Sequence, residues 1–494
     1  MQQTAILLPV DNRPITYLFP QLICRLAGLK VLIPPRNLMG SLIAPTNIDA
    51  LSSWLEQAVI QASGGAIFVC LDSLLYGGLI PSRRSNDSLE IILSRAAKIS
   101  NLKKLCAGKF KIYAQASIMR ISDNYDNTEE KPYWSQYGRE IFHWSSLLHK
   151  QEAGLLDSGS ELEAVEAQIK SEIRDDYLAT RERNFAVNKK IIDYVVRCDI
   201  DYLIFSQDDS GKYGLNVLEK EKLIQIAKEK QATNIRAYAG ADEVLMSLIA
   251  HYLNTQHRPP PKILVQYSSP SGKAIASNYE GQNIGSSFAC QAEAQGLQVI
   301  TEADNTDFTV IVHTGSTIQG DHICLPGFND SSAIDTKTSA ARVIDLIKQA
   351  KTPVVICDVA YANGADPLLI DLLLQHQQLF KQIWSYAGWN TTGNTIGCAL
   401  AVGSACWYAM SHNILSEQDR KSLLFLRLLD DWAYQTQVRK ELMATRSTDN
   451  ALVASLMDKY ANIIAKGLDF KPQSIQYSLP WHRTFEVEVA TELS

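Results

Sequence analysis

The chain has 494 residues, of which 46% are hydrophobic and 20% are charged, and its formal net charge is -6. This length is too great for one ordinary core, so we expect two domains or one large barrel with additions. No run of lysine or arginine is present, and no apolar stretch reaches the roughly 18 residues of a membrane helix, so neither a nucleic-acid nor a membrane partner is predicted.

The N-terminal segment predicts a cytoplasmic protein. The apolar run Ala5–Val10 meets Asp11-Asn12-Arg13 at once and follows no basic region, which is typical of a first strand rather than a signal peptide. The nine cysteines are irregularly spaced and form no CxxC pair. We therefore expect buried thiols in a reducing compartment, among them Cys70, Cys198 and Cys357, rather than disulfides or a zinc site.

Short apolar runs alternate with longer amphipathic segments along most of the chain, and this rhythm indicates an α/β fold. The runs are apolar on both faces, as parallel strands covered by helices are. In chain order the predicted strands are Ala5–Val10, Lys30–Ile33, Ala66–Leu71, Lys111–Ser117, Tyr202–Ser206, Ile235–Ala239, Ile263–Tyr267, Phe308–Val312, Val354–Cys357 and Ile383–Tyr386. Helices are predicted after most of them, for example over Leu51–Ala62, Asp242–Tyr252, Ala340–Ala350 and Pro367–Leu379.

Three segments interrupt this rhythm and set the predicted domains. A polar and aromatic insertion runs from Ile121 to about Arg174, and a proline-rich linker covers Gln256–Pro261. From about Glu417 the chain is helical and charged, before a strand-like end at Thr484–Val489. We therefore predict an N-terminal α/β domain over 1–258 with an insertion at about 121–175, a C-terminal α/β part over 259–416 and a helical extension over 417–494. No internal repeat is evident.

The predicted architecture is a (β/α) barrel-like fold with insertions. Ten candidate strands exceed the eight of a simple barrel, so the alternative is two doubly wound α/β domains joined at the Pro259–Pro261 linker. Both arrangements bind ligands at the carboxyl ends of their strands, so polar residues at those ends are the candidates for function.

The strongest local signal is Asp208-Asp209, which follows a predicted strand. Like charge and partial burial raise the pKa of one carboxyl in such a pair, which supplies an acid beside an anion for general acid catalysis. The alternative is an ordinary turn in which an Asp caps the next helix. Asp242 follows the next strand and is a third candidate catalytic residue if the two strands are neighbours. We interpret Glu243 as a residue of the first helical turn.

Polar residues also follow the other predicted strands, and their number favours one shared site over independent helix caps. One helix face carries Tyr177, Arg181 and two asparagines, which could reach a substrate, brace the carboxylates or simply be solvated. Trp389 could stack on a sugar, and a core position is the alternative. The candidate substrate-binding residues are Asp11, Arg13, Asp72, Tyr76, Arg120, Arg181, Asn184, Asn188, Asp358, Asn363, Trp389, Asn390 and Asn394.

No cofactor and no metal are predicted. The chain has no GxGxxG, P-loop or GxSxG motif, and its histidines lack HxH or HExxH spacing. An all-oxygen Mg²⁺ or Ca²⁺ site formed by Asp208, Asp209 and Asp242 is the alternative that these residue types leave open.

Taken together, these segments resemble a bacterial family of uncharacterised proteins, domain of unknown function 4127. The resemblance covers nearly the whole chain and implies a bacterial origin, but it implies no activity. It is carried by Leu8–Pro14, Leu71–Ile80, Arg183-Asn184 with Asn188, Gln207–Ser210, Gly240–Glu243, Asp358–Gly364 and Tyr386–Thr391 with Asn394-Thr395.

A more local resemblance concerns chemistry. Adjacent Asp residues after a strand look like the pair of retaining N-acetylhexosaminidases that use the acetamido group of the substrate as nucleophile. This resemblance implies that Asp208 polarises the acetamide and that Asp209 is the acid. We therefore predict a glycoside hydrolase acting on a small-molecule or oligosaccharide substrate. The alternatives are a metal-dependent hydrolase using the same aspartates and a non-catalytic intracellular sugar- or metabolite-binding protein.

Overall fold

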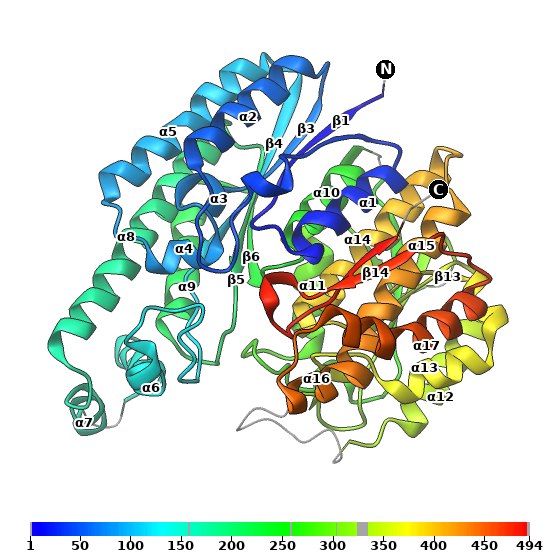
Figure 1. Cartoon of the computed structure of the whole chain (residues 1–494). Helices are drawn as coiled ribbons and strands as arrows, with labels where there is room; N and C mark the ends of the chain where they lie inside the picture. The colour runs from blue at the N-terminus through cyan, green and yellow to red at the C-terminus, as the bar shows by residue number, and fades with distance from the viewer. Residues whose placement is uncertain (1, 157–158, 257–258, 303, 324–333, 492–494) are drawn as a thin grey trace. The chain divides into compact units, whose positions relative to one another are not determined.

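The computed structural model describes residues 2–156, 159–256, 259–302, 304–323 and 334–491. The chain forms two compact units (Figure 1). Unit 1 comprises Met1–Asn12, Lys30–Leu245 and Tyr279–Gly281, and unit 2 comprises Arg13–Leu29, Met246–Asn278 and Gln282–Ser494. Each unit is built around its own parallel sheet.

The sheet of unit 1 has six parallel strands in the order β2-β1-β3-β4-β5-β6. Helix α5 contacts both α2 and α8, and α8 contacts α9, so these four helices form one layer. Asn47 and Ser88 start α2 and α5 by accepting hydrogen bonds from backbone N–H groups in the first helical turn. The bounds are β1 (Thr4–Leu8), β2 (Lys30–Leu32), β3 (Gly65–Cys70), β4 (Phe110–Ile118), β5 (Tyr202–Gln207), β6 (Ile235–Ala239), α2 (Ile48–Gln61), α5 (Leu89–Cys106), α8 (Ser171–Val196) and α9 (Leu215–Glu229).

The main sheet of unit 2 has five parallel strands in the order β8-β7-β9-β11-β13. Helix α11 contacts α14, and α12 contacts α13, so the helices of this unit form two pairs. The bounds are β7 (Lys262–Tyr267), β8 (Gln298–Ile300), β9 (Phe308–His313), β11 (Val354–Asp358), β13 (Ile383–Ala387), α11 (Ile284–Ala294), α12 (Lys337–Gln349), α13 (Pro367–Gln375) and α14 (Thr392–Ser411).

The two main sheets have the same strand order, although the sequence shows no repeat. In each, the second strand lies outside the first, and the later strands continue from the other side of the first. In sheets of this order the strand sequence reverses direction between the first and third strands, and ligands bind outside the carboxyl ends of those strands. The reversal lies between β1 and β3 in unit 1 and between β7 and β9 in unit 2.

The predicted α/β class with parallel strands is confirmed, whereas the barrel is not. Within the described residues the strand order runs from β2 to β6 in unit 1 and from β8 to β13 in unit 2, with no pairing that closes either row. An apolar run in the sequence indicates a buried strand, but it does not indicate which strands pair with that strand, so it cannot distinguish a closed barrel from an open sheet. His257 and Arg258, within the predicted linker, lie outside the described residues.

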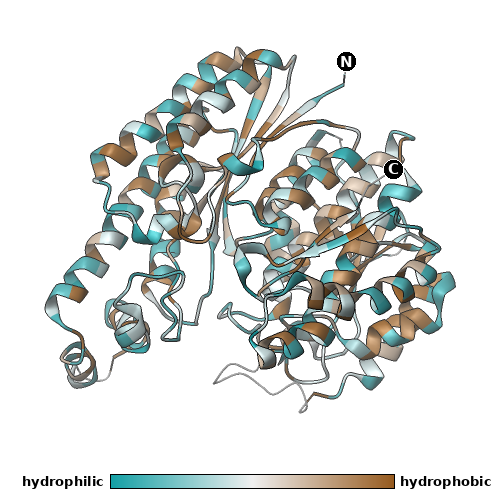
Figure 2. Cartoon of the chain, viewed as in Figure 1, coloured by the Kyte–Doolittle hydropathy of each residue, from teal (hydrophilic) through white to brown (hydrophobic). Residues whose placement is uncertain are grey.

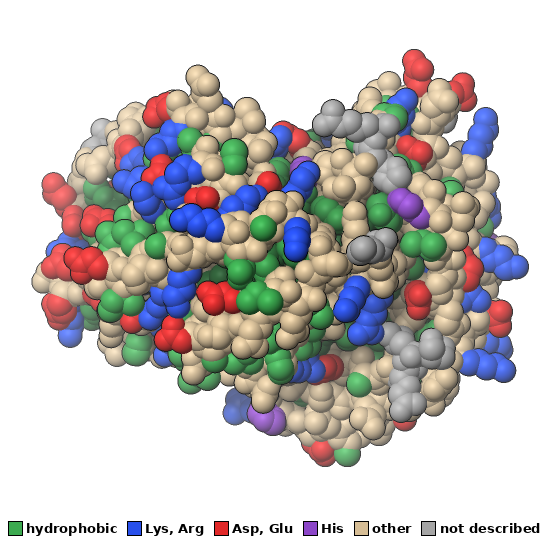
Figure 3. Space-filling view, turned by 90° about the horizontal axis from the view of Figure 1, so that it is seen from above, with side chains coloured by type: hydrophobic (Ala, Val, Ile, Leu, Met, Phe, Trp, Pro, Cys, Tyr) green, Lys and Arg blue, Asp and Glu red, His purple; other side chains and the backbone are tan. Residues whose placement is uncertain are grey.

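The hydropathy pattern explains why these elements form. The strands β1 and β9 are buried along their whole length, and the helices carry alternating apolar and polar stripes (Figure 2). On the face shown in Figure 3, acidic and basic side chains are intermixed. No helix in the described ranges combines the length and the hydropathy that crossing a membrane requires.

The predicted insertion after β4 contains helices α6 (Trp134–Glu152) and α7 (Ser160–Glu166). It has a small core of its own, in which Trp134 and Trp144 lie 6.1 and 6.3 Å from the ring of Tyr177 on α8. Tyr177 is therefore a packing residue of the insertion. The segment 119–130, which follows β4 and includes the start of the insertion, lies at the carboxyl end of the unit 1 sheet and supplies charged residues there.

The helical part predicted from about Glu417 is present. It comprises α15 (Glu417–Arg427), the π-helix η6 (Leu428–Val438), α16 (Arg439–Thr445) and α17 (Asn450–Leu468). An antiparallel pair of strands follows, β14 (Ile475–Ser478) and β15 (Glu488–Thr491), so the final strand lies a few residues later than predicted.

The cysteines give a direct test of this packing. Cys70 and Cys357 are buried free thiols as predicted, but the prediction is wrong for Cys198, which is exposed where α8 ends. We expect Cys198→Ser to remove one fast-reacting thiol when the native protein is titrated with a thiol reagent, because burial protects the thiol of Cys357. The matched variant Cys357→Ser should leave the fast phase unchanged. A fast phase that Cys198→Ser does not reduce would contradict the described end of α8.

Candidate active site

The Asp208-Asp209 pair lies at the carboxyl end of β5, as the sequence predicts. Its backbone is unusual, because Asp209 has a φ of 35°, in the left-handed region. Asp and Asn tolerate this conformation better than other residues with a Cβ atom. The turn therefore directs two consecutive carboxylates out of the end of a buried strand.

Two arginines hold this acidic pair. Arg83, which is buried, donates from Nη2 to Asp208 Oδ2 at 2.9 Å. Arg120 places Nη1 at 3.3 Å from Asp208 Oδ2 and at 3.4 Å from Asp209 Oδ2, so one nitrogen contacts both carboxylates. The pair is thus fixed by charge-assisted contacts that come from the segments after β3 and β4; Arg83 lies on the short helix α4 (Leu79–Arg84).

Two glutamates from the insertion complete the cluster. Glu130 Oε1 lies 2.8 Å from Arg120 Nε and 3.3 Å from Arg83 Nη1. Glu129 Oε2 lies 2.9 Å from Arg120 Nη2 and 3.6 Å from Arg83 Nη1. Four carboxyl groups therefore surround two guanidinium groups, and the excess of acid favours keeping a proton on one of them.

Asp209 is the group that keeps this proton. Burial, and then the charge of Asp208, raise the pKa of Asp209 to about 7, while Arg120 and Arg83 oppose the shift. The side chain is still 30% exposed, so its proton can be exchanged with solvent or donated to a ligand. Adjacent groups of this kind provide an acid and an anion at neutral pH.

The helix face on α8 braces the site and does not line it. Arg181 forms a two-point ion pair with Glu219, at 2.8 and 2.6 Å, and donates to the carbonyl of Met119 at 3.0 Å. Asn184 donates to the carbonyl of Ser82 at 2.9 Å, beside Arg83. These predicted substrate-binding residues are therefore positioning residues, because their donors hold the two segments that carry the arginines.

Asn188 has a similar role. Its amide donates to the carbonyl of Ser117, at the end of β4, at 3.1 Å. Asp72 is buried at the end of β3 and accepts the backbone N–H of the same Ser117 at 3.0 Å. Burial raises the pKa of Asp72. Both residues therefore bind the backbone of β4, and neither is positioned by these contacts to meet a substrate.

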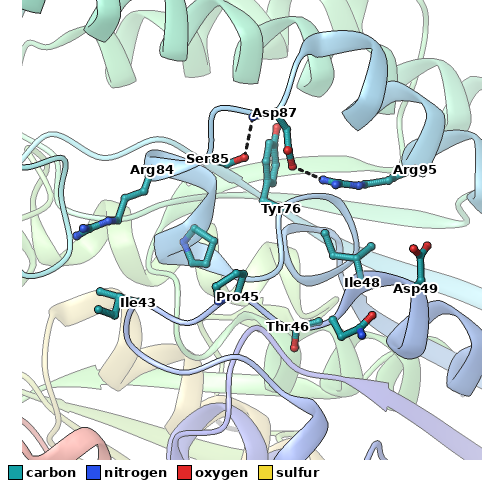
Figure 4. Close-up of a pocket in the computed structure, with 12 residues that line it drawn as sticks. Ile43, Pro45, Thr46, Ile48, Asp49, Tyr76, Arg84, Ser85, Asp87 and Arg95 are labelled. Atoms are coloured by element: carbon teal, nitrogen blue, oxygen red, sulfur yellow. Dashed lines mark hydrogen bonds and ion pairs between the residues drawn. The ribbon is translucent and has the colours of Figure 1, made fainter.

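Tyr76 lines a pocket of about 490 Å³ in unit 1 (Figure 4). Across its upper edge in the figure, Arg95 pairs with Asp87 at 2.6 Å, and the lower side is the segment from Ile43 to Asp49. Arg84 links this pocket to the acidic cluster, because its Nη1 donates at 2.7 Å to the carbonyl of Glu130. The remaining lining residues are Pro45, Thr46, Asn47, Ile48, Pro81 and Ser85.

Gln207 is a polar side chain next to the pair that the sequence analysis did not select. It is 1% exposed, and neither its amide oxygen nor its amide nitrogen has a hydrogen-bond partner among the described residues. An unpaired buried amide costs about 1–3 kcal/mol, which marks this position for a water molecule or a ligand group.

The other predicted residues of unit 1 are only partly connected to the pair. Asp242 is buried in the segment after β6. Its prediction as a catalytic residue required β5 and β6 to be neighbours, and the two strands do pair. Asp11 is buried after β1, where the hydroxyl of Ser73 donates to the carbonyl of Pro9 at 2.7 Å. This contact joins the carboxyl ends of β1 and β3.

The predicted residues of unit 2 belong to a different cluster. Asp358, at the end of β11, accepts the hydroxyl of Tyr386 at 2.7 Å, and burial raises its pKa to about 6. Its neighbour Asp366 binds His313 Nε2 at 2.8 Å, and His313 Nδ1 lies 3.1 Å from the hydroxyl of Ser268. This is a buried network at the strand ends of unit 2.

Trp389 is a core residue. It is 1% exposed, and its ring lies 5.8 Å from that of Phe485, so no face of the indole is open for a sugar. Asn363 and Asn390 both have left-handed backbones, and the carbonyl of Asn390 accepts the N–H of Asn363 at 2.8 Å. Asn394 donates to Thr391 Oγ1 at 3.2 Å in the first turn of α14. Asn363 and Asn390 therefore shape turns, and Asn394 helps to start a helix.

Sequence reasoning missed Arg83, Glu129 and Glu130. Arg83 is 125 residues from Asp208 in the chain, and a charged residue on a short helix usually faces solvent. One signal was present in the sequence. The adjacent acidic residues Glu129 and Glu130 lie in the polar insertion that begins just after Arg120, at the end of a predicted strand.

The donor set does not suit a divalent cation. The carboxylates of Asp208 and Asp209 face guanidinium groups, which occupy the positions that a cation would need. Across the ranges that the structure describes, no group of three or more His, Cys, Asp and Glu side chains is arranged to hold a metal ion. The cluster instead fits acid–base chemistry on a neutral, polar ligand.

Comparison with known proteins gives a family but no activity. A family model described as "Protein of unknown function (DUF4127)" matches residues 5–490. A search of curated proteins found no match. Among solved structures, the chain is 9% identical to the "dinucleotide forming Acetyl-coenzyme A synthetase 1 (apo form)" of Ca. Korarchaeum cryptofilum, over 84% of this chain and 97% of that one. The TM-score is 0.18, so this match supports no inference.

Proposed function

Since the chain belongs to the DUF4127 family of proteins of unknown function, its activity has to be inferred from its site, and we propose that it is a carbohydrate-active hydrolase that cleaves glycosidic bonds. The observation that carries the proposal is the Asp208-Asp209 pair, in which the pKa of Asp209 is raised to about 7 beside a carboxylate held by two arginines. Most glycoside hydrolases use a pair of carboxyl groups in which one is an acid and the other an anion.

In the proposed reaction Asp209 donates its proton to the oxygen of the leaving group. The bond from that oxygen to the anomeric carbon breaks, and positive charge develops on the sugar ring. Asp208 stabilises this charge or, on an N-acetylated sugar, orients the acetamido group that attacks the anomeric carbon. A water molecule then attacks the anomeric carbon, displacing the acetamido oxygen where that has added, and gives its proton to Asp209, which restores the acid. Arg83 and Arg120 hold the carboxylate of Asp208 in place for this role, because each places a nitrogen within 3.3 Å of its Oδ2 atom.

The pocket in Figure 4 supports a ligand of this class. Its volume of about 490 Å³ is within the range of small-molecule sites. It combines an aromatic ring, that of Tyr76, with the carboxylate of Asp87 and with apolar walls from Pro45 and Ile48. Aromatic and apolar surfaces pack on the C–H faces of sugars, and carboxylates accept bonds from hydroxyl groups.

The alternative is a hydrolase in which a metal ion is bound by the same aspartates, and the guanidinium contacts argue against it. A screen of the purified protein against chromogenic glycosides, including N-acetylglucosaminides and muropeptide fragments, with and without EDTA, separates the two. We expect product release that survives EDTA. Activity that EDTA abolishes would assign the aspartates to a metal, and binding of sugars without any turnover would favour a binding protein.

A further inference from the structure

The pocket of about 490 Å³ in unit 1 has a basic side, formed by Arg84 and Arg95, that the proposed reaction does not use. Arg84 is the last residue of α4 and follows Arg83 directly. Arg83 donates to Asp208 in the acidic cluster, whereas Arg84 lines the pocket (Figure 4). Two consecutive residues of one short helix therefore serve the acidic pair and the pocket separately.

Arg84 keeps free the edge of its guanidinium group that suits a carboxylate. Among the described residues its hydrogen bonds all come from Nη1 and go to backbone carbonyls of the segment 127–130, the shortest being 2.7 Å to Glu130. Its Nε and Nη2 make none, and neither atom is buried. Arg181 uses these same two atoms to bind both carboxylate oxygens of Glu219, at 2.8 and 2.6 Å. The matching edge of Arg84 is therefore open to a ligand.

The charges around the pocket do not cancel. Arg95 pairs with Asp87 at 2.6 Å, and Asp49 at the rim pairs with Lys98 at 3.0 Å. These two pairs use both acidic residues that line the pocket. Arg84 forms no ion pair in the part of the chain that the structure describes, so its positive charge is left without a counter-ion.

Arg183 on α8 adds to this excess. It donates to the carbonyls of Ser85 and Asp87, which line the pocket, and it lies 5.8 Å from the centre of the Tyr76 ring. Tyr76 is 6% exposed, and its hydroxyl makes no hydrogen bond within the described ranges. Figure 4 shows its ring between Asp87 above and Pro45 below. The pocket thus combines positive charge with an aromatic ring and an unused hydroxyl.

Glu130 connects the pocket to the acidic cluster. Its carboxylate contacts Arg83 and Arg120, and its carbonyl accepts the Nη1 of Arg84. The cluster has more carboxyl groups than guanidinium groups and therefore repels an anion, whereas the basic side of the pocket attracts one. A substrate with an anionic group at one end is thereby oriented, with that group in the pocket and its neutral ring toward Asp209.

We propose that the pocket binds a carboxylate or phosphate group of the substrate through Arg84, so that the hydrolase acts on acidic rather than neutral saccharides. This inference rests on the proposed function and adds the class of its substrate. The guanidinium fork matches the oxygens of both groups. Arg95 supplies further donors, because its Nη1 alone makes its contacts with Asp87 and with the carbonyl of Leu75, and its Nε and Nη2 have no partner among the described residues.

The test is a calorimetric titration of the full-length protein, at constant ionic strength, with three sugars that contain no glycosidic bond: glucuronate, glucose 6-phosphate and glucose. We expect saturable binding of at least one anionic sugar, with an affinity at least about tenfold above that for glucose. Arg84→Ala should remove this preference, and Arg84→Lys, which keeps the charge but loses the fork, should keep part of it. Arg342→Ala, an exposed arginine on α12, should bind as the wild type does.

A second variant leaves the backbone contacts of Arg84 intact. Ser85→Asp adds a negative charge to the pocket wall, and its carboxylate can still accept the N–H of Asp87, as the Ser85 hydroxyl does at 3.0 Å. It should weaken binding of the anionic sugar about tenfold and leave binding of glucose unchanged. If Arg84 served only to hold the segment 127–130, Arg84→Ala would weaken the charged and the neutral sugars equally.

The titrations also identify the anionic group. Binding of glucuronate alone assigns a carboxylate site, and binding of glucose 6-phosphate alone assigns a phosphate site. Three results would overturn the proposal: equal affinities for glucose and the anionic sugars, no saturable binding of any of the three by the folded wild type, or equal effects of Arg84→Ala and Arg342→Ala. None of these readouts involves turnover, so they are separate from failure of the hydrolase proposal, which the screen with chromogenic glycosides decides.

Discussion

Replacing Asp209 with Asn is expected to abolish the hydrolase activity while making the folded protein more stable at alkaline pH. The activity should fall about 10²–10⁴-fold, because an amide cannot donate the proton that the leaving group needs. Asn tolerates the left-handed backbone of this position, where φ is 35°, so the turn should be kept. Activity on the best substrate from the screen and unfolding in urea at several pH values check the two effects.

The stability effect follows from the raised pKa. Asp209 has a pKa of about 7 in the folded protein, above the usual value of about 4 in an unfolded chain, so the folded state binds its proton more tightly. Stability therefore falls as the pH rises from about 4 to 7, and Asn removes this loss. Because the side chain is 30% exposed, we expect a gain of about 1–2 kcal/mol at pH 8 and little change at pH 4.

A purely structural role for Asp209 predicts a different pair of results. If its carboxylate were needed to hold Arg120, Asp209→Asn would lower the free energy of unfolding at every pH above 4, and any activity would fall only in proportion to the unfolded fraction. Asp201→Asn is a matched control, because this Asp forms an ion pair with Lys103 at the opposite end of β5. Full activity of Asp209→Asn would rule out this residue as the acid.

The second large effect is expected on stability. Arg427→Ala should lower the free energy of unfolding by about 3–5 kcal/mol, because it leaves the carboxylate of Asp431 buried without its counter-ion. The two side chains are 3% and 0% exposed, and Arg427 Nε lies 3.2 Å from Asp431 Oδ2. Asp431 also accepts the N–H of Gly388 at 2.7 Å and the N–H of Ala365 at its carbonyl, so it ties the ends of β12 (Tyr361–Ala362) and β13 to η6.

An exposed ion pair provides the comparison. Lys222 and Glu152 are 45% and 50% exposed and lie 2.7 Å apart, and Lys222→Ala should cost no more than about 1 kcal/mol. Urea unfolding of both variants measures the difference. Similar small losses for Arg427→Ala and Lys222→Ala would show that water reaches the Arg427–Asp431 pair and would contradict the described packing of η6.

The sequence was sufficient for the features that depend on local pattern. The apolar run Tyr202–Ser206 becomes β5, and the acidic pair stands at its end as predicted, because a buried parallel strand and the polar turn after it are both visible in a few residues. The buried thiol of Cys357 was predictable for the same reason. The strand with its acidic pair and the buried thiol are both determined by residues close to them in the sequence.

The features that depend on distant residues were not predictable. Nothing in the short segment around Arg83 shows that it meets Asp208, 125 residues further along. Arg181 has the spacing of a polar helix face, yet its donors hold Glu219 and a backbone carbonyl. Trp389 follows a strand end with asparagines around it, but it packs on Phe485 from the last part of the chain. The predicted barrel is also not confirmed, because the burial of a strand does not specify which strands pair with it.

The ionisation of Asp209 is the most direct test of the proposed active site, and it needs no substrate. Protein labelled with ¹³C at the aspartate carboxyl carbons can be titrated by NMR between pH 4 and 9, for the wild type and for Asp209→Asn. We predict a carboxyl resonance of Asp209 with an apparent pKa near 7, which is absent from Asp209→Asn. The resonances of Asp358 and Asp430, whose pKa values are also raised, should remain in the variant. If the resonance lost in Asp209→Asn titrates below about pH 5, Asp209 is ionised at neutral pH and cannot be the acid.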